Sequence, residues 1–220
     1  MPIDTLLPTS DLERIEAAVQ DAESGTSGEI VPYIVARSDD YGEAPWKAAA
    51  LALLVGVLLT GLSHAWRETW GPWPWLFDTL IVAGLGALGW LAGCFIPFLT
   101  CLLIGGHELD LRVRRRAAVA FIEAEVFRTQ ARIGILLLVS LFERRVVLLG
   151  DRGINERVAP ERWKGIVDRI TRGLKEDRLV SALVDGIEAL GELLRQSGLE
   201  AGPNDRDELP DRPRTGGEKR

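Results

Sequence analysis

Asp151 is the side chain of this sequence best suited to chemistry. It follows the apolar run Val146–Leu149 and lies in the segment Gly150-Asp151-Arg152-Gly153, where glycine lets the backbone approach a ligand closely. Arg152 beside it is able to hold a phosphate or to pair with a carboxylate. Phosphate hydrolysis needs a nucleophile or a metal-bound water and a way to neutralise developing charge, and this pair is compatible with it. The pair equally suits a structural turn, so both interpretations stay open.

Further charged residues are predicted to lie near Asp151. The strand before Asp151 should run antiparallel to Ile135–Leu141, which brings Asp151 towards Arg132 and the loop Gly25–Glu29. We therefore expect one small cleft at this end of the sheet. Its binding residues would be Glu29, Arg132, Gly150 and Gly153, and its catalytic residues Asp151 and Arg152.

Calcium is the one cofactor that the sequence suggests. Asp39 and Asp40 end a predicted strand and are candidate calcium ligands together with a carboxylate from elsewhere; as a solvated pair at a strand end they need no ligand. The two histidines, His64 and His107, do not form a metal cluster. The sequence has no Asp-x-Asp signature, no Walker loop and no His-Glu-x-x-His motif.

The candidate site depends on a predicted β-hairpin. Ile135–Leu141 and Val146–Leu149 are short apolar runs that fit strands, with a turn at Phe142–Arg145 carrying Glu143 as a turn charge. Strands without polar alternation are usually covered on both faces. A third strand is expected at Glu29–Arg37. We therefore predict an α/β protein, specifically an α/β/α sandwich with a small mixed sheet.

Helical patterns surround these strands. Ala117–Gln130 has one apolar stripe, and Pro160–Leu174 and Arg178–Gln196 are amphipathic. The stripe of the first helix consists of Val119, Ile122, Val126 and Thr129. The order of elements predicts a parallel βαβ unit. The soluble domain is then discontinuous, formed by residues 1–40 and 112–200, and residues 201–220 are expected to be a disordered tail rich in Pro, Gly and charge.

Two apolar segments interrupt this domain between residues 46 and 104. Residues 46–63 and 79–104 approach or exceed the roughly 20 apolar residues needed to cross a bilayer, and Pro97 is able to kink the second. They predict a transmembrane helical hairpin. A buried helical hairpin of a soluble protein is the alternative, but a domain of this size could hardly cover two such helices.

Aromatic and basic residues flank the two predicted spans and suggest an orientation. The residues assigned to the membrane interface are Trp66, Trp70, Trp73 and Trp75 in the link, and Arg112, Arg114, Arg115 and Arg116 after the second span. Tryptophans in a short turn suit an interfacial belt, with an aromatic ligand cage as the alternative. The arginines place both termini in the cytoplasm by the positive-inside rule, and they are also able to bind anionic lipid. The net charge of -6 argues against nucleic-acid binding.

Several stretches together resemble the TPM domain family, named for a thylakoid lumen protein, a photosystem II repair protein and a modulator of levamisole receptors. They are Glu29-Ile30-Val31, Thr129-Gln-Ala-Arg132-Ile-Gly134, the series VSLFERRVVLLGDRGI and the tail motif Glu208-Leu209-Pro210-Asp211. The resemblance is greatest to a bacterial branch with a membrane hairpin inside the domain. It implies an α/β/α sandwich. Some members are described as acid phosphatases, some bind calcium, and others are non-catalytic accessory domains. Ile133 stands where this branch commonly has Thr, which removes a polar group near any pocket.

These observations predict a protein of the cell inner membrane, multi-pass, with both termini in the cytoplasm. Its expected function is that of an accessory or interaction module for a membrane-protein partner, because a convincing catalytic set is missing. The alternative is a metal-assisted acid phosphatase centred on Asp151.

Overall fold

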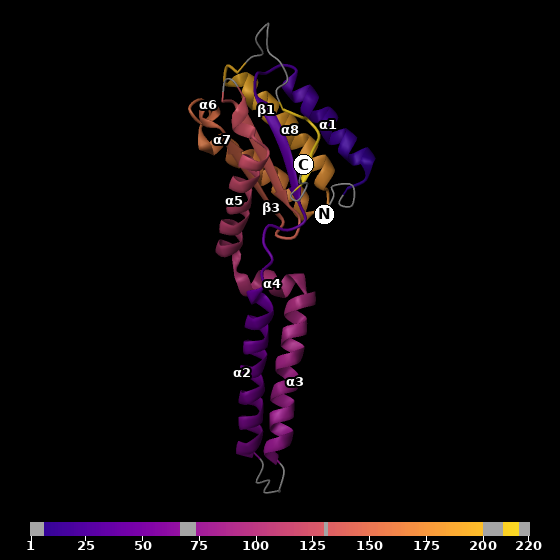
Figure 1. Cartoon of the computed structure of the whole chain (residues 1–220), viewed down its shortest axis with the longest axis vertical. Helices are drawn as coiled ribbons and strands as arrows, with labels where there is room; N and C mark the ends of the chain where they lie inside the picture. Colours follow the sequence, from indigo (N-terminus) through magenta and orange to yellow (C-terminus); the bar gives the residue numbers. More distant parts are fainter. Residues whose placement is uncertain (1–6, 67–73, 130–131, 200–208, 216–220) are drawn as a thin grey trace. The chain divides into compact units, whose positions relative to one another are not determined.

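The computed structural model describes residues 7–66, 74–129, 132–199 and 209–215, and the chain divides into two units (Figure 1). The first, which we call the α/β unit, combines Met1–Asp39 with Asp110–Arg220. The second, the hairpin unit, is the intervening segment Asp40–Leu109. The α/β unit is therefore discontinuous in sequence, because its two segments flank the whole hairpin unit.

The α/β unit contains a mixed sheet with the strand order β3-β2-β1-β4. Strand β1 (Glu29–Val35) is parallel to β2 (Gly134–Ser140), as predicted, and β2 is antiparallel to β3 (Arg145–Gly150). Every residue of β1 and β2 is buried, which explains why neither strand alternates between apolar and polar residues. A fourth strand, β4 (Arg214–Thr215), pairs with β1.

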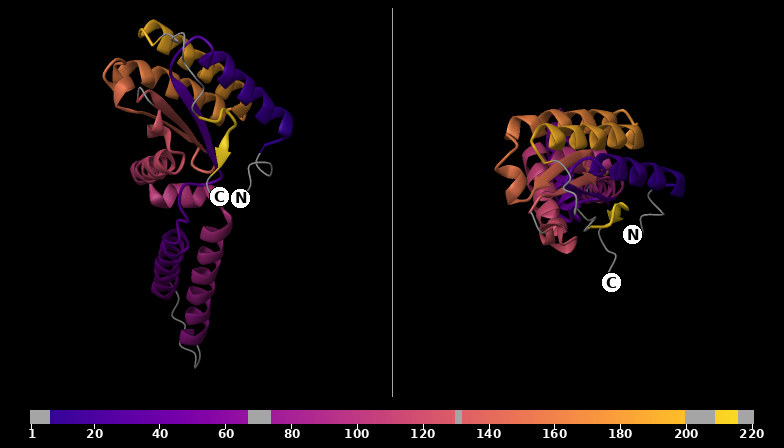
Figure 2. Two further views of the ribbon diagram at one scale, coloured as in Figure 1. Left: turned by 45° about the horizontal axis from the view of Figure 1, so that its top comes forward. Right: turned by 90° about the horizontal axis from the view of Figure 1, so that it is seen from above.

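Helices cover both faces of this sheet, and Figure 2 shows α5 on one side and the pair α7 and α8 on the other. One face packs against α1 (Thr9–Glu23), α7 (Pro160–Lys175) and α8 (Leu179–Gln196). The opposite face packs against α5 (Gly106–Glu123). Alternate residues of a strand point to opposite faces, so both sets of β1 and β2 side chains are apolar. The predicted α/β/α sandwich is thus confirmed.

Helix α5 differs from its prediction in both its bounds and its buried face. It ends at Glu123 rather than at Gln130, and a 3-10 helix follows at Val126–Arg128. Its buried stripe against the sheet consists of small residues, Val113, Ala117 and Ala120, and continues in Ala124 just after the helix. Val119 and Ile122, predicted on one stripe with the buried Val126, are instead 48% and 65% exposed. The small residues let the helix backbone lie close to the sheet, and this contact, rather than apolar size, determines the inward face.

The C-terminal segment also departs from the prediction of a disordered tail. Arg214 and Thr215 pair in parallel with Tyr33 and Ile34 of β1, and Leu209 is buried in the core on the α5 side. Residues 201–208 and 216–220 lie outside the described residues. The sequence rule failed here because a short strand needs few apolar residues of its own when an existing sheet edge supplies the hydrogen-bonding partners.

The hairpin unit consists of α2 (Glu43–Trp66), α3 (Pro74–Phe95) and α4 (Pro97–Ile104). The single long segment predicted at 79–104 is therefore two helices. Ile96 between them adopts extended backbone angles (φ -104°, ψ 100°), because a residue before proline is pushed out of the helical region. Within the part of the chain that the structure describes, two helices are long and apolar enough to cross a membrane, Glu43–Ala65 and Trp75–Phe95.

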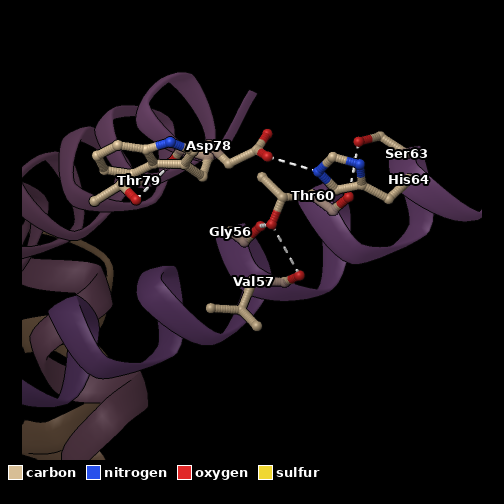
Figure 3. Close-up of polar contacts among 8 residues, drawn as sticks. Gly56, Val57, Thr60, Ser63, His64, Asp78 and Thr79 are labelled. Atoms are coloured by element: carbon tan, nitrogen blue, oxygen red, sulfur yellow. Dashed lines mark hydrogen bonds and ion pairs between the residues drawn. The ribbon is translucent and has the colours of Figure 1, made fainter. Parts of the chain in front are cut away.

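Helices α2 and α3 approach each other closely through glycines of α3. A Cβ on Gly89 would lie 2.5 Å from the Cβ of Ala52, and one on Gly93 would lie 2.6 Å from the Cα of Pro45. Small residues allow such close helix packing. Further along the pair, the ring nitrogen Nε2 of His64 lies 2.6 Å from Oδ2 of Asp78, which joins the two helices by a polar contact (Figure 3).

Candidate functional site

The structure brings together the strand ends on which the predicted site depends. The backbone N–H of Asp151 donates to the carbonyl oxygen of Gly134 at 2.9 Å, which continues the pairing of β2 with β3. The N–H of Gly153 donates to the carbonyl oxygen of Arg132, also at 2.9 Å. Arg132 itself has a left-handed backbone (φ 57°). Asp151 therefore lies beside Arg132 and Gly134, where the antiparallel hairpin was expected to place it.

The carboxylate of Asp151 makes two contacts within the fold. Asp151 is the N-cap of the short helix α6 (Arg152–Asn155), and its Oδ1 accepts from the backbone N–H of Arg152 at 2.7 Å. Its Oδ2 is buried and lies 3.5 Å from the guanidinium Nη1 of Arg132. This arrangement anchors a turn and pairs a carboxylate with a cation, and it serves structure as directly as it would serve a ligand.

The remaining strand-end residues point to other partners. The guanidinium of Arg152 is paired with Glu156 at 2.8 Å, and that contact raises the pKa of Arg152. The carbonyl oxygen of Gly150 accepts from Nδ2 of Asn155. Arg152 is thus engaged by its own helix, on which it and Glu156 are one turn apart.

Glu29 belongs to a group of carboxylates that sequence reasoning missed. Glu29 is opposite Gly134 in the β1–β2 register and only 8% exposed, and its charge acts on Glu23 at the end of α1. The pKa of Glu23 is raised to about 9, mainly by burial; the neighbouring carboxylates of Glu29 and Asp211 act in the same direction, and a hydrogen bond from the N–H of Ile30 acts against them. The only signal in the sequence was the tail motif containing Asp211. We call these three residues, Glu23, Glu29 and Asp211, the carboxylate group.

A second buried carboxylate, Glu143, was predicted to be a turn charge. It is only 7% exposed, and it accepts from the backbone N–H of Ser38 at 2.9 Å and from the hydroxyl of Ser140. Glu143 therefore ties the β2–β3 turn to the segment that leaves β1. A glutamate beside two arginines in a turn gives no local sign of burial, so nothing in the sequence pattern indicates this contact.

Of the two residues predicted as calcium ligands, Asp39 and Asp40, the structure pairs Asp39 with an arginine. Oδ2 of Asp39 accepts from Nη1 of Arg112 at 2.9 Å, so a guanidinium already neutralises this carboxylate. Asp40 begins the hairpin unit. Across the described ranges, no three His, Cys, Asp or Glu side chains gather in a way that could hold a metal ion.

The residues assigned to the membrane interface separate into two kinds. Two of the arginines contact other side chains of the α/β unit: Arg112 pairs with Asp39, and Arg116 pairs with Glu123 at 3.0 Å and donates to the hydroxyl of Tyr33 at 2.9 Å. Arg114 and Arg115 are exposed. In the hairpin unit, Trp66 ends α2 and Trp75 is 63% exposed at the start of α3, while Trp70 and Trp73 lie outside the described residues.

The geometry defines the α/β unit as an α/β/α sandwich with a mixed sheet, whose polar residues gather at the strand ends. The sequence model of the TPM domain matches residues 110–193, so this part of the chain is similar to the TPM domain family. The NMR structure of the BA42 protein from the psychrophilic bacterium Bizionia argentinensis is similar in fold, with a TM-score of 0.58 and 20% sequence identity over 96% of this chain and 95% of that chain. No curated protein matches this sequence.

Proposed function

We propose that this protein is a membrane-anchored module, in which α2 and α3 cross the cell inner membrane and the TPM domain binds a membrane-protein partner on the cytoplasmic face. The observation that carries the proposal is the exposed apolar surface of the two helices. Only 17% and 11% of the residues in their most apolar windows are buried. The core helix of a soluble protein would be mostly covered, whereas lipid covers such a surface in a membrane.

The pairing of β1 with β2 supports an even number of membrane crossings. Glu29 to Val35 precede the hairpin unit in the sequence, and their partners, Gly134 to Ser140, follow it. Both strands must therefore lie on the same side of a bilayer, which two crossings allow and one does not. The arginines after Ile104 favour the cytoplasmic side by the positive-inside rule.

An accessory role is supported by the contacts of the strand-end residues. Asp151 caps α6 and pairs with Arg132, and Arg152 pairs with Glu156. Each side chain that the sequence offered for catalysis thus has a partner within the α/β unit. A domain of this kind offers a surface to a partner more readily than a reacting centre to a substrate.

The orientation is tested by cysteine labelling in intact cells. Cys94 and Cys101 are first replaced by alanine, and single cysteines are then introduced as Ser10→Cys or Thr69→Cys. A membrane-impermeant thiol reagent should label Thr69→Cys and leave Ser10→Cys unlabelled until the cells are lysed. Labelling of Ser10→Cys with protection of Thr69→Cys would reverse the orientation. Release of the protein by alkaline carbonate would refute membrane insertion.

The partner is tested by co-purification from crosslinked membranes in mild detergent. The full chain should recover a membrane protein at a constant ratio, and the hairpin segment 40–109 alone, used as the control bait, should not. Recovery of only lipid and chaperones, or equal recovery by both baits, would refute the partner role of the TPM domain.

The alternative is an acid phosphatase centred on Asp151, which the pairing of Asp151 with Arg132 supports. A metal-assisted reaction is the weaker form of this alternative, because the described residues do not provide a metal site. Purified full-length protein is assayed on an aryl phosphate with calcium, magnesium or a chelator, beside Asp151→Asn. Activity that is lost in Asp151→Asn would establish the alternative; absence of activity under all conditions, or equal activity in the variant, would exclude it.

A further inference from the structure

Helix α5 carries a mixed basic and apolar surface on the side that faces away from the sheet. Leu111, Arg115, Ala118 and Ile122 are spaced to share one helical face, and all four are exposed. Val119 and Arg114 are exposed beside them. We call these six residues, Leu111, Arg114, Arg115, Ala118, Val119 and Ile122, the outer face of α5. Ile122 is 65% exposed, which is a large fraction for an isoleucine in a folded domain.

The four arginines of α5 divide according to helical position. Arg112 and Arg116, with 17% side-chain exposure each, are turned towards the α/β unit, where they pair with Asp39 and Glu123. The guanidinium of Arg116 also lies over the ring of Tyr33 at 5.2 Å. The other two, Arg114 and Arg115, are on the exposed side. The basic cluster thus has a structural half and an exposed half, and only the exposed half is free to serve an external surface.

Two acidic side chains next to the outer face, Asp110 and Glu123, are paired with arginines of the α/β unit. Asp110 pairs with Arg145 at 3.0 Å, and Glu123 pairs with Arg116. The outer face therefore combines positive charge with an apolar row. This combination complements an anionic bilayer surface, where guanidinium groups contact lipid phosphates and apolar side chains enter the boundary between headgroups and acyl chains.

We propose that the outer face of α5 lies on the bilayer and binds anionic lipid headgroups, so that the sheet is separated from the membrane by α5 alone. The inference rests on the proposed membrane anchoring. Continuity of the chain supports it, because α4, the last apolar helix, ends at Ile104 and Leu111 follows only seven positions later. The α1, α7 and α8 side of the sheet then faces away from the lipid and is left for a protein partner.

The contact is measured with an environment-sensitive fluorophore on the full-length protein in nanodiscs. The cysteine-free background receives Ala118→Cys on the outer face or, as the comparison, Lys164→Cys on α7, which packs against the opposite face of the sheet. The nanodiscs contain phosphatidylcholine alone or phosphatidylcholine with phosphatidylglycerol, each with a trace of lipid carrying a quencher. The fluorophore at position 118 should be blue-shifted and quenched in the anionic discs, and the fluorophore at 164 should be neither.

Two charge variants test the role of the exposed arginines. Arg114→Gln with Arg115→Gln should lower the equilibrium constant between the quenched and unquenched states of the fluorophore. The expected decrease is roughly fivefold per arginine, which corresponds to about 1 kcal/mol per basic residue near an anionic surface. Arg169→Gln with Arg172→Gln, two exposed arginines of α7, removes the same charge elsewhere and should leave the quenching unchanged. High salt should act like the first variant.

The proposal is overturned if the fluorophore at position 118 is neither more blue-shifted nor more quenched than the one at position 164 in both kinds of nanodisc. Equal quenching in neutral and anionic discs would overturn the recognition of anionic lipid. A blue shift at position 118 that appears only at high protein concentration and without quenching by lipid would overturn the lipid contact and indicate a contact between two copies of the chain. Failure of the protein to enter nanodiscs at all would refute the proposed anchoring. An inserted protein whose fluorophore at position 118 is not quenched would refute only the lipid contact of α5.

Discussion

Replacing Glu23 by glutamine should make the stability of the α/β unit less dependent on pH. Burial is the main cause that raises the pKa of Glu23 from the ordinary 4.5 to about 9, and the charges of Glu29 and Asp211 contribute to this increase. Its position at the last residue of α1 also disfavours a negative charge, because the carbonyl end of a helix is negative. Arg195 of α8, which lies against Gly25, is paired with Glu192.

The magnitude follows from the proton that the folded state holds and the unfolded chain releases. Between pH 4.5 and about 9 the folded chain binds this proton more strongly, so its contribution to stability is complete below pH 4.5 and is lost as the pH rises through about 9. One pH unit corresponds to about 1.4 kcal/mol, so from about pH 6 to about pH 8 the natural protein should lose about 3 kcal/mol relative to the variant. Glutamine resembles the protonated acid: its carbonyl accepts from the N–H of Ile30, and its amide is able to donate to Asp211.

The assay is urea unfolding of the full-length protein in detergent, read by a short pulse of protease that cleaves the unfolded α/β unit. The midpoint of the natural protein should fall from about pH 6 to about pH 8 by about 1 M urea more than that of Glu23→Gln. Glu13→Gln, an exposed position on the same helix, is the matched control and should follow the natural protein. Parallel pH profiles for all three proteins would show that Glu23 is ionised in the folded state and would refute the reasoning.

Three further substitutions test the packing and the buried polar contacts by the same unfolding assay. Gly134→Ala should destabilise the protein by about 2 kcal/mol or more, because its Cβ would lie 2.3 Å from the carbonyl oxygen of Val126. The control Gly165→Ala, where a Cβ meets nothing within 4 Å, should be neutral or stabilise by about 0.5–1 kcal/mol. Equal effects of the two variants would contradict the close approach at Gly134. Glu143→Ala should cost about 1–3 kcal/mol, because it leaves a buried serine hydroxyl and a backbone N–H without their acceptor; a change within about 0.5 kcal/mol would mean that Glu143 is exposed. Arg116→Ala should cost about 1–2 kcal/mol through the loss of its contacts with tyrosine and glutamate, whereas the same change at the exposed Arg115 should cost less than about 0.5 kcal/mol; similar losses would place both arginines in solvent.

Sequence patterns correctly predicted the strands and helices whose signals are local. The predicted bounds agree to within a few residues for the strands β1, β2 and β3 and for the amphipathic helices α7 and α8. In these segments the pattern of apolar residues shows whether both faces or one stripe is buried. The same patterns gave the parallel and antiparallel pairings, and with them the position of Asp151 beside Arg132 and Gly134. These inferences succeeded because strand order and connection rules leave few alternatives for a short sheet.

Two features depend on tertiary contacts instead: which side chains of α5 are buried, and which carboxylates lie close together. An alanine stripe packs against the sheet, and larger apolar residues such as Ile122 are left outside, because the backbone must approach closely and only small side chains permit it. Glu23 and Asp211 are far apart in the sequence, and they meet only because the tail adds β4 to the edge of β1. Such contacts depend on strand pairing between distant segments, so the local sequence around either residue does not predict them.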